Sequence, residues 1–220
     1  PRPFYPIGHG TPIKQQLQAF ADASDLAWCY VIYLRTITSD NQVHVAFVCG
    51  NTKVLPKGVC VKGQLSIPRA ELNAAVDLAR KVLEVEQELG LSEEFCLPTI
   101  YYSDSRDVLA WVQNNTTKET VPRYIASRIN TIRKLSNPHQ WQYIPTEDNP
   151  ADIGTRPITA KELQASNWLI GPPFIHHTNP ETPIKNTTPT PEVSLLISAK
   201  TSNVNSYFKS KHRHATESIT

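Results

Sequence analysis

Four acidic residues occupy positions where a lone carboxylate is costly. Asp22 and Asp104 stand at the ends of apolar, strand-like segments, and Glu71 and Asp152 stand at the starts of helix-like segments. A carboxylate in such surroundings costs free energy unless it is paired or bound to a cation. Each one alone is most simply explained as a helix cap or a turn residue. Because strand ends and packed helices converge at one edge of a sheet, the four together predict a shared site.

The chemistry that suits clustered carboxylates is the binding of divalent cations. Mg²⁺ prefers oxygen ligands, and proteins commonly supply a few carboxylates while a substrate phosphate supplies the rest. Two ions roughly 4 Å apart stabilise both the attacking water and the leaving oxygen of a phosphodiester. Carboxylates that repel one another are neutralised when the metal enters. We therefore expect two Mg²⁺ ions, with Mn²⁺ as an alternative, at Asp22, Glu71, Asp104 and Asp152.

The segments that must position these carboxylates begin with three strands. Residues 15–23, 28–36 and 43–49 are rich in aromatic and β-branched residues or alternate in polarity, which is typical of strands. Asp40 and Asn41 suit the turn between the last two. The short separations predict an antiparallel meander.

Helices and further strands follow the meander. Pro68 is typical of a first helical turn, apolar residues recur at helical spacing up to residue 88, and Gly90 ends the helix. The remaining elements expected are a strand over 99–102, helices over 106–113 and 121–135, a strand over 141–144, and short helices over 148–153 and 160–166. This order predicts an α/β fold: a mixed five-stranded sheet, three antiparallel strands plus two parallel ones, with helices on both faces.

Composition and charge narrow the class of protein. The 220 residues are 40% hydrophobic and 19% charged, which is enough apolar material for a core and excludes wholesale disorder. No run approaches the roughly 18 apolar residues that span a bilayer, so we expect no membrane partner. Residues 1–174 hold 17 basic and 17 acidic side chains, so the net charge of +2 comes entirely from residues 175–220. A neutral domain must bind nucleic acid through local patches or metal ions.

The chain divides into three parts. Residues 1–14 are expected to form an irregular lead-in, residues 15–175 one domain, and residues 176–220, rich in Thr, Asn, Ser and Pro, a disordered tail or linker. The four cysteines show no C-x-x-C spacing, which favours buried thiols in a reducing compartment. Met is absent even at position 1, which we interpret as the mark of a piece of a longer polyprotein.

Short motifs surround each of the four carboxylates. They are FADAS at 20–24, IPRAEL at 67–72, YSDS at 102–105 with VLAWV at 108–112, WQYIP at 141–145 with NPAD at 149–152, and Trp168 followed by Gly-Pro at 171–172. In this order and spacing they resemble the ribonuclease H domain of Bel/Pao-type (Pao family) retrotransposon polyproteins. The resemblance covers residues 15–175, about three quarters of the chain.

The resemblance implies a ribonuclease H-like fold and a Mg²⁺-dependent endonuclease that cuts the RNA strand of RNA–DNA hybrids during reverse transcription. The four carboxylates would be its catalytic metal ligands. Candidate substrate-binding residues are Ser24, Asn73 and Ser105, each more simply explained as a cap or a packing-neutral polar residue. Arg123 and Arg128 are further candidates, for which a solvated helix face is an equally simple explanation. The implied partners are the hybrid and the reverse transcriptase domain of the same polyprotein. The implied location is the cytoplasm, including virus-like particles.

One stretch departs from the family pattern. Many relatives carry a His just before the last carboxylate, whereas residues 142–147 read QYIPTE. Metal chemistry does not require that His, so its absence does not exclude activity. The sequence does not predict the rate of turnover without it. Asp148 is a second candidate for the fourth ligand, although its place before Pro150 favours a helix cap.

Two other functions fit the same fold. A decayed or domesticated retroelement would leave a catalytically inactive nucleic-acid-binding or scaffold module, yet such a copy would be expected to lose a carboxylate. A different two-metal nuclease or transposase would rearrange the last acidic element, and the NPAD motif argues against it. Fold similarity alone does not decide between them.

Overall fold

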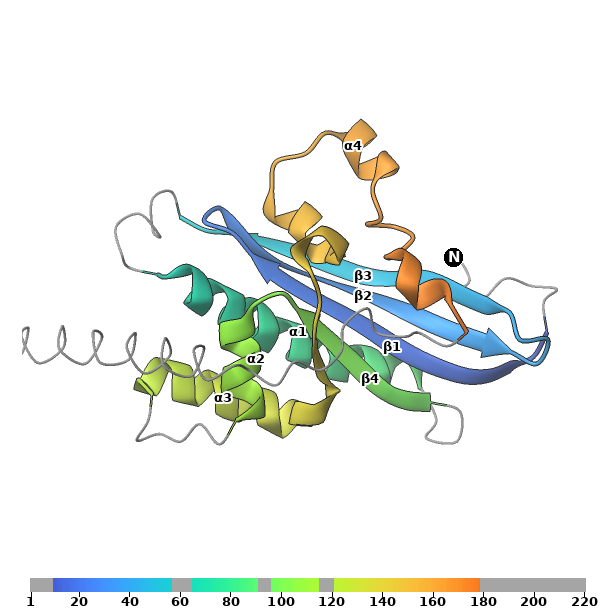
Figure 1. The fold of residues 1–220 in the computed structure, drawn as a ribbon, viewed down its shortest axis with the longest axis horizontal. Coiled ribbons are helices and arrows are strands. Elements are labelled where there is room, and N and C mark those ends of the chain that lie inside the picture. The colour runs from blue at the N-terminus through green and yellow to red at the C-terminus, as the bar shows by residue number, and fades with distance from the viewer. Residues whose placement is uncertain (1–9, 57–64, 91–95, 115–120, 179–220) are drawn as a thin grey trace, which may run out of the picture.

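A mixed five-stranded sheet forms the centre of the molecule. The computed structural model describes residues 10–56, 65–90, 96–114 and 121–178. The strands are β1 (Pro12–Ala23), β2 (Ala27–Thr38), β3 (Val43–Val54), β4 (Cys96–Ser103) and β5 (Trp141–Tyr143), in the spatial order β3-β2-β1-β4-β5 (Figure 1). The pairs β1–β2 and β2–β3 are antiparallel, whereas β1–β4 and β4–β5 are parallel. The predicted sheet is thus confirmed.

Three α-helices cover one face of this sheet: α1 (Ile67–Leu89), α2 (Arg106–Gln113) and α3 (Arg123–Leu135) (Figure 1). As predicted, α1 has Pro68 in its first turn and ends at Gly90, whose φ of 57° is in the left-handed region that glycine tolerates. Its apolar stripe is buried against β1 and β2 and includes Leu72, Leu78 and Val82. None of the described helices is long and apolar enough to cross a membrane.

Short helices make up most of the last part of the described chain. The 3-10 helices η1 (Pro138–Gln140) and η2 (Thr146–Asp148) flank β5, and η3 (Pro150–Thr155), α4 (Ala160–Ala165) and η4 (Pro173–His176) complete the described chain. Of these, η3 and η4 pack on the opposite face of the sheet, where Ala151 and Ile175 join a second, smaller core. In this core Phe20 stacks on Tyr102 with ring centroids 4.6 Å apart. This aromatic layer anchors the last part of the domain on the sheet.

Several elements differ in extent from the prediction. β1 begins at Pro12 rather than 15, β4 begins at Cys96 rather than 99, and β3 continues to Val54 rather than 49. β3 continues because its end pairs with the start of β2, in a register that reaches Ala27–Val54. These backbone hydrogen bonds stabilise a strand in a segment whose polar, glycine-containing sequence favours a loop. The turn at Asp40 and Asn41 is confirmed, with Asn41 at a φ of 61°.

A buried arginine fixes the end of the described chain. Arg35 is 2% exposed and donates to the carbonyl oxygens of Ile175, His177 and Thr178, the first at 2.9 Å from Nε. A desolvated guanidinium needs such acceptors because an unpaired buried charge is costly. Residues 176–178, assigned to the tail from sequence, are therefore held against β2. Residues 1–9 of the predicted lead-in and 179–220 of the predicted tail lie outside the described residues.

Candidate active site

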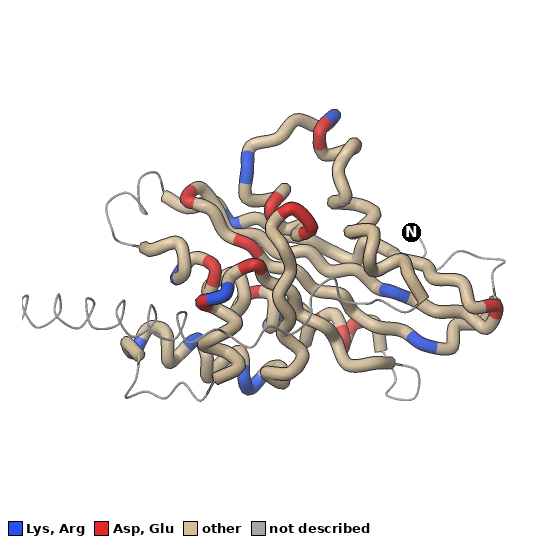
Figure 2. Tube along the Cα trace, in the orientation of Figure 1, with Lys and Arg blue, Asp and Glu red and all other residues tan. Residues whose placement is uncertain are grey.

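Asp22 and Asp104 end two neighbouring parallel strands. The register pairs Ala21 of β1 with Ser103 of β4, and each aspartate is the next residue along its chain. Strands that run in the same direction end at the same edge of the sheet, so the two carboxylates lie close together, as the sequence predicts. Figure 2 shows acidic positions from several elements gathered at this edge.

Asp22 is the most buried of these acids. It is 7% exposed, and the hydroxyl of Thr155 donates to its Oδ2 at 3.1 Å. The pKa of Asp22 is raised to about 7, because burial disfavours the anion and because the charge of Asp104 repels it. The charge of Asp152 acts in the same direction, and the Thr155 hydrogen bond opposes it. The anion of Asp22 is thus poorly solvated and has like-charged neighbours.

Asp104 accepts hydrogen bonds on both carboxylate oxygens. Thr146 Oγ1 donates to Oδ2 at 2.6 Å, and Asn149 Nδ2 lies 3.5 Å from Oδ1. Both donors come from the segment between β5 and η3. The Asn149 amide also donates to the carbonyl oxygen of Ala21 at 3.1 Å. This segment therefore joins the ends of β1 and β4.

Glu71 reaches the same edge from the helical face. The hydroxyl of Ser105 donates to Glu71 Oε2 at 2.6 Å, and the same hydroxyl caps α2 by accepting from the Val108 amide at 3.3 Å. Because Ser105 directly follows Asp104, this bond brings the carboxylate of Glu71 to the strand end. The predicted role of Ser105 as a cap is confirmed, and the hydrogen bond to Glu71 is an addition to it.

Asp152 approaches from the opposite face, on η3. Its Oδ1 lies 2.5 Å from Arg156 Nη2 in an ion pair, and its charge is one of those that raise the pKa of Asp22. The expectation that Asp148 caps this helix is wrong, because the side chain that caps η3 is Asn149, which accepts from the Ala151 amide at 3.2 Å. Asp148 lies in η2 instead.

The donor set fits a hard divalent cation by its chemistry. Carboxylate oxygens are the ligands that Mg²⁺ prefers, and the repulsion between Asp22 and Asp104 is what a bound cation relieves. As the side chains lie, no three His, Cys, Asp or Glu residues of the described segments are grouped closely enough to hold one ion. The carboxylates are instead bound to hydroxyls and to Arg156. Ligation would exchange some of these contacts for the cation.

Ser24 and Thr155 connect the site to its scaffold. Ser24 Oγ donates to the Thr155 carbonyl oxygen at 2.9 Å and accepts from the amides of Leu26 and Ala27. Thr155 in turn binds Asp22. Ser24, a candidate for substrate contact, therefore fixes the turn after β1 against the end of η3.

Asn73 and Arg128 form a separate contact between α1 and α3. Asn73 Oδ1 accepts from Tyr124 Oη at 2.9 Å and from Arg128 Nε at 2.6 Å. The guanidinium of Arg128 lies 3.4 Å from the centroid of the Tyr124 ring. Arg123, the remaining candidate for substrate contact, is exposed at the start of α3. The structure does not bring these candidates into contact with the four carboxylates.

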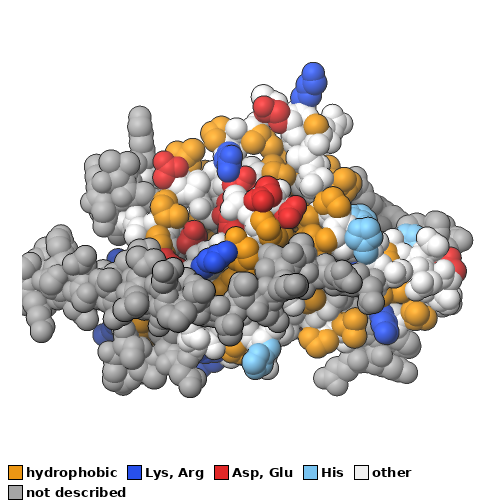
Figure 3. All heavy atoms as spheres, viewed as in Figure 1, with side chains coloured by type: hydrophobic (Ala, Val, Ile, Leu, Met, Phe, Trp, Pro, Cys, Tyr) orange, Lys and Arg blue, Asp and Glu red, His pale blue; other side chains and the backbone are white. Residues whose placement is uncertain are grey.

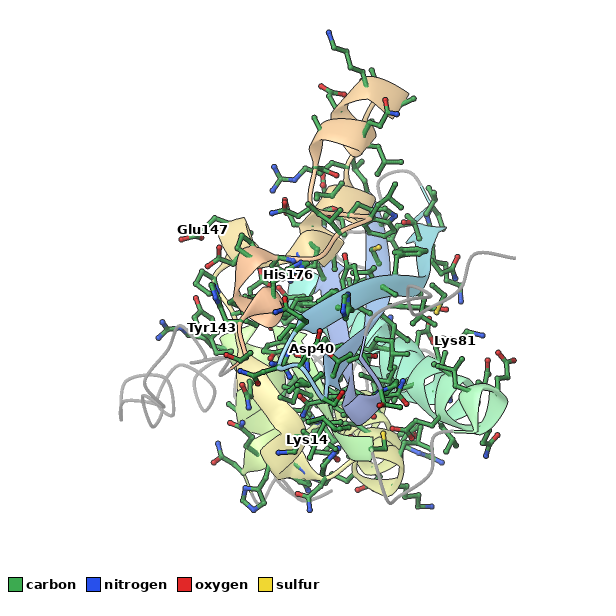
Figure 4. The ribbon with its side chains drawn as sticks, turned by 90° about the vertical axis from the view of Figure 1, so that its right-hand side faces the viewer. Lys14, Asp40, Lys81, Tyr143, Glu147 and His176 are labelled. Carbon is green, nitrogen blue, oxygen red and sulfur yellow. The ribbon has the colours of Figure 1, made fainter. Side chains whose placement is uncertain are left out.

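Basic side chains lie beside the acidic edge. Figure 3 shows Asp and Glu side chains grouped on one face of the molecule, with Lys or Arg next to them. Arg106, two residues after Asp104, lies 4.9 Å from the centroid of the Tyr143 ring. Tyr143 and the outward-pointing Glu147 are labelled on the same side of the molecule in Figure 4. The surface around the site thus presents both signs of charge.

Sequence reasoning missed three polar residues at the site: Thr146, Asn149 and Thr155. Asn149 entered only as part of the NPAD motif and of the helix start predicted at residues 148–150, and the two threonines were not singled out. Thr155 and Asp22, which form a hydrogen bond, are 133 positions apart in the sequence, and Thr146 and Asp104 are 42 positions apart. Such pairings depend on how η2 and η3 pack on the sheet, which local sequence patterns do not specify.

Comparison with known sequences confirms the resemblance for the first part of the chain. Residues 4–105 match the model of a family described as the Pao retrotransposon-like RNaseH-like domain. The matched part is just under half of the chain and includes Asp22, Glu71 and Asp104, whereas Asp152 lies beyond it. No curated protein matches the sequence.

Solved structures similar to this chain include ribonucleases H. RNase H1 from the halophilic archaeon Halobacterium salinarum NRC-1 is 12% identical with a TM-score of 0.37, over 70% of this chain and 99% of that one. LC11-RNase H1 in complex with an RNA/DNA hybrid is 13% identical with a TM-score of 0.38, over 64% and 92%. The prototype foamy virus protease–reverse transcriptase is 12% identical with a TM-score of 0.34, over 70% and 22%. Together with the sheet order, the family match identifies the fold as ribonuclease H-like.

Proposed function

We propose that this chain is a metal-dependent endonuclease that hydrolyses the RNA strand of RNA–DNA hybrids during retrotransposon reverse transcription. The observation that carries the proposal is the meeting of Asp22 and Asp104 at adjacent parallel strand ends. Glu71 and Asp152 approach the same edge from the two faces of the sheet. This arrangement stands in a domain of which residues 4–105 match an RNaseH-like family.

The four carboxylates are the residues that would hold the metal. When bound, Mg²⁺ supplies an activated water and neutralises charge on the phosphodiester. The contribution of the chain is to gather the anions and to keep them from solvent. Because the pKa of Asp22 is about 7 without a cation, a proton must leave this carboxyl when it becomes a ligand. Metal affinity should therefore rise with pH.

The proposed substrate and partner follow from the charge of the domain and from its family. Residues 1–174 are neutral overall, so the hybrid must be held through local basic groups and through the metal rather than by a general basic field. A hybrid duplex can be recognised by its shape, its phosphates and its 2′-hydroxyls without reading bases. The proposed source of the hybrid, and the partner, is a reverse transcriptase domain of the same polyprotein.

The test is cleavage of a labelled RNA–DNA hybrid by the 220-residue chain with Mg²⁺, with Mn²⁺ and with EDTA. Asp104→Asn removes one charge at the site. Asp40→Asn is its matched control, because Asp40 lies in the β2–β3 turn at the other end of the sheet and is labelled in Figure 4. Metal-dependent cutting of the RNA strand that is lost only in Asp104→Asn supports the proposal. Cutting that survives both EDTA and Asp104→Asn contradicts it.

A second candidate is an inactive module that binds hybrid without cutting it. The observation that favours it is the pairing of Asp152 with Arg156, which occupies a carboxylate that the enzyme would need. The absence of a His from residues 142–147 points in the same direction. Hybrid binding by folded protein with no cutting under any metal would favour this module over the enzyme.

A further inference from the structure

We propose that Thr146 and Asn149 are positioning residues that fix the carboxylate of Asp104, and that Asn149 also sets the spacing between Asp22, Asp104 and Asp152. The inference rests on the proposed function, because it concerns how the same site is held ready for a cation. It extends that function to two residues that are not carboxylates.

The side-chain amide of Asn149 contacts one aspartate, Asp104, and the residues that precede two others, Asp22 and Asp152. Its Nδ2 donates at 3.1 Å to the carbonyl oxygen of Ala21, the residue before Asp22, and lies 3.5 Å from Asp104 Oδ1. Its Oδ1 accepts at 3.2 Å from the amide of Ala151, the residue before Asp152. The side chain is 3% exposed, so these bonds do not compete with bulk water. One planar amide thus connects β1, the end of β4 and η3.

Thr146 holds the other oxygen of the same carboxylate. Its hydroxyl donates to Asp104 Oδ2 at 2.6 Å, while Asn149 faces Oδ1. A hydrogen-bond donor at each oxygen of the carboxylate restricts rotation about χ2 of Asp104. Without such donors, this torsion angle takes a broad range of values. A carboxylate held in this way loses less freedom when it binds an ion, and such supporting bonds set metal affinity.

A second asparagine in the same local setting shows that capping alone does not require these contacts. Asn137 precedes Pro138 and caps η1, as Asn149 precedes Pro150 and caps η3. The side chain of Asn137 accepts from the His139 amide at 3.0 Å, and the residue is exposed. Burial and the bonds to remote groups therefore distinguish Asn149 from an ordinary cap.

The decisive measurement is the dissociation constant of Mg²⁺ from the 220-residue chain, obtained by calorimetric titration without nucleic acid. Asn149→Ser keeps a side-chain oxygen for the Ala151 amide but is too short to reach Ala21 and Asp104. We expect Mg²⁺ to bind about 10- to 100-fold more weakly, the range typical for loss of a ligand's supporting partner. Asn137→Ser makes the same change at η1 and should leave the dissociation constant unaltered.

Thr146 provides a test that does not disturb the buried region, because this residue is exposed. Thr146→Val keeps the shape of the side chain and removes the donor, whereas Thr146→Ser keeps the donor. We expect weaker Mg²⁺ binding and a lower kcat with an unchanged KM for the hybrid in Thr146→Val, and recovery of both in Thr146→Ser. A purely structural residue would lower thermal stability without this pattern.

The outcomes separate this inference from the proposed function. If the wild-type chain binds Mg²⁺ and cuts hybrid while Asn149→Ser and Thr146→Val bind Mg²⁺ as tightly as the wild type, the positioning role is wrong and the nuclease stands. If the wild-type chain binds Mg²⁺ without cutting, weaker binding by both variants still supports the positioning role. If the wild-type chain does not bind Mg²⁺ at all, both proposals fail.

Discussion

Gly154 of η3 packs directly against the thiol of Cys29 in β2. A Cβ built at Gly154 would overlap Cys29 Sγ, and it would also lie 3.0 Å from Thr52 Oγ1. The carbonyl oxygen of Gly154 accepts from the Thr52 hydroxyl at 2.9 Å. Through this close contact the segment that carries Asp152 packs on the sheet. Adding a single methyl group at Gly154 therefore tests how tightly the segment packs there.

Gly154→Ala is therefore expected to destabilise the protein by about 1–3 kcal/mol, the usual cost of overpacking a tight contact. Urea denaturation measures the free energy of unfolding. The double variant Cys29→Ala with Gly154→Ala opens space for the new methyl group and should cost less than the two single changes added together. Simple additivity of the two effects would show that the overlap with Cys29 is not the cause.

The raised pKa of Asp22 predicts how stability depends on pH. In the unfolded chain this carboxyl ionises near 3.8, whereas in the folded, metal-free protein it ionises near 7. Between these values the folded state binds more protons, so the free energy of unfolding should fall as pH rises from about 4 to about 7, by at most about 1.4 kcal/mol per pH unit from this group. Below pH 4 the effect is absent.

Asp22→Asn isolates this effect, because an amide of the same shape carries no titratable proton. Denaturation in EDTA at pH 5 and at pH 8 should show a smaller loss of stability in the variant than in the wild type. Mg²⁺ at pH 8 should restore stability to the wild type and leave the variant unchanged. Parallel pH curves for the two proteins would contradict the assigned pKa.

The ion pair between Arg156 and Asp152 predicts competition with a bound cation. Arg156→Gln frees the carboxylate, so Mg²⁺ should bind a few-fold more tightly in a calorimetric titration. Stability should change by less than about 1 kcal/mol, because the Arg156 side chain is 61% exposed and surface pairs contribute little. Weaker Mg²⁺ binding in Arg156→Gln would mean that the guanidinium orients Asp152 for the cation instead.

Arg35 predicts where the domain ends. A chain ending at residue 178 keeps the three carbonyl acceptors, whereas a chain ending at residue 174 leaves a buried guanidinium without them. We expect the shorter chain to be less stable by at least about 3–5 kcal/mol, because it breaks a buried charged contact on one side and also removes the buried side chain of Ile175. Urea denaturation of the two truncated chains gives the difference, and equal stabilities would show that residues 175–178 do not stabilise the domain.

The strands and helices, and the places of Asp22 and Asp104 at strand ends, could be predicted because they depend on local patterns. Period-two and helical spacings indicated the elements, and Asp22 and Asp104 stood where strands ended. Helix α2 was predicted with the bounds that the structure gives it, Arg106–Gln113. Pro68 and Gly90 marked the limits of α1 to within a residue or two.

What could not be predicted depends on contacts between distant parts of the chain. The polar end of β3 becomes a strand only because β2 offers it a hydrogen-bonding edge. Arg35 looked like an ordinary strand residue, and only the return of residues 175–178 explains its burial. The choice of Asn149 over Asp148 as the cap of η3 depends on a side chain that also bonds to Ala21 and faces Asp104.

The contacts of Thr155 determine when the site can form during protein synthesis and folding. Asp22 and Ser24 bond to a residue more than 130 positions later in the chain. Contacts of such long range form slowly, because the entropy of closing the intervening loop must be overcome first. A nascent chain would expose Asp22 long before Thr155 leaves the ribosome. Competence to bind a cation should therefore appear only when the domain is nearly complete.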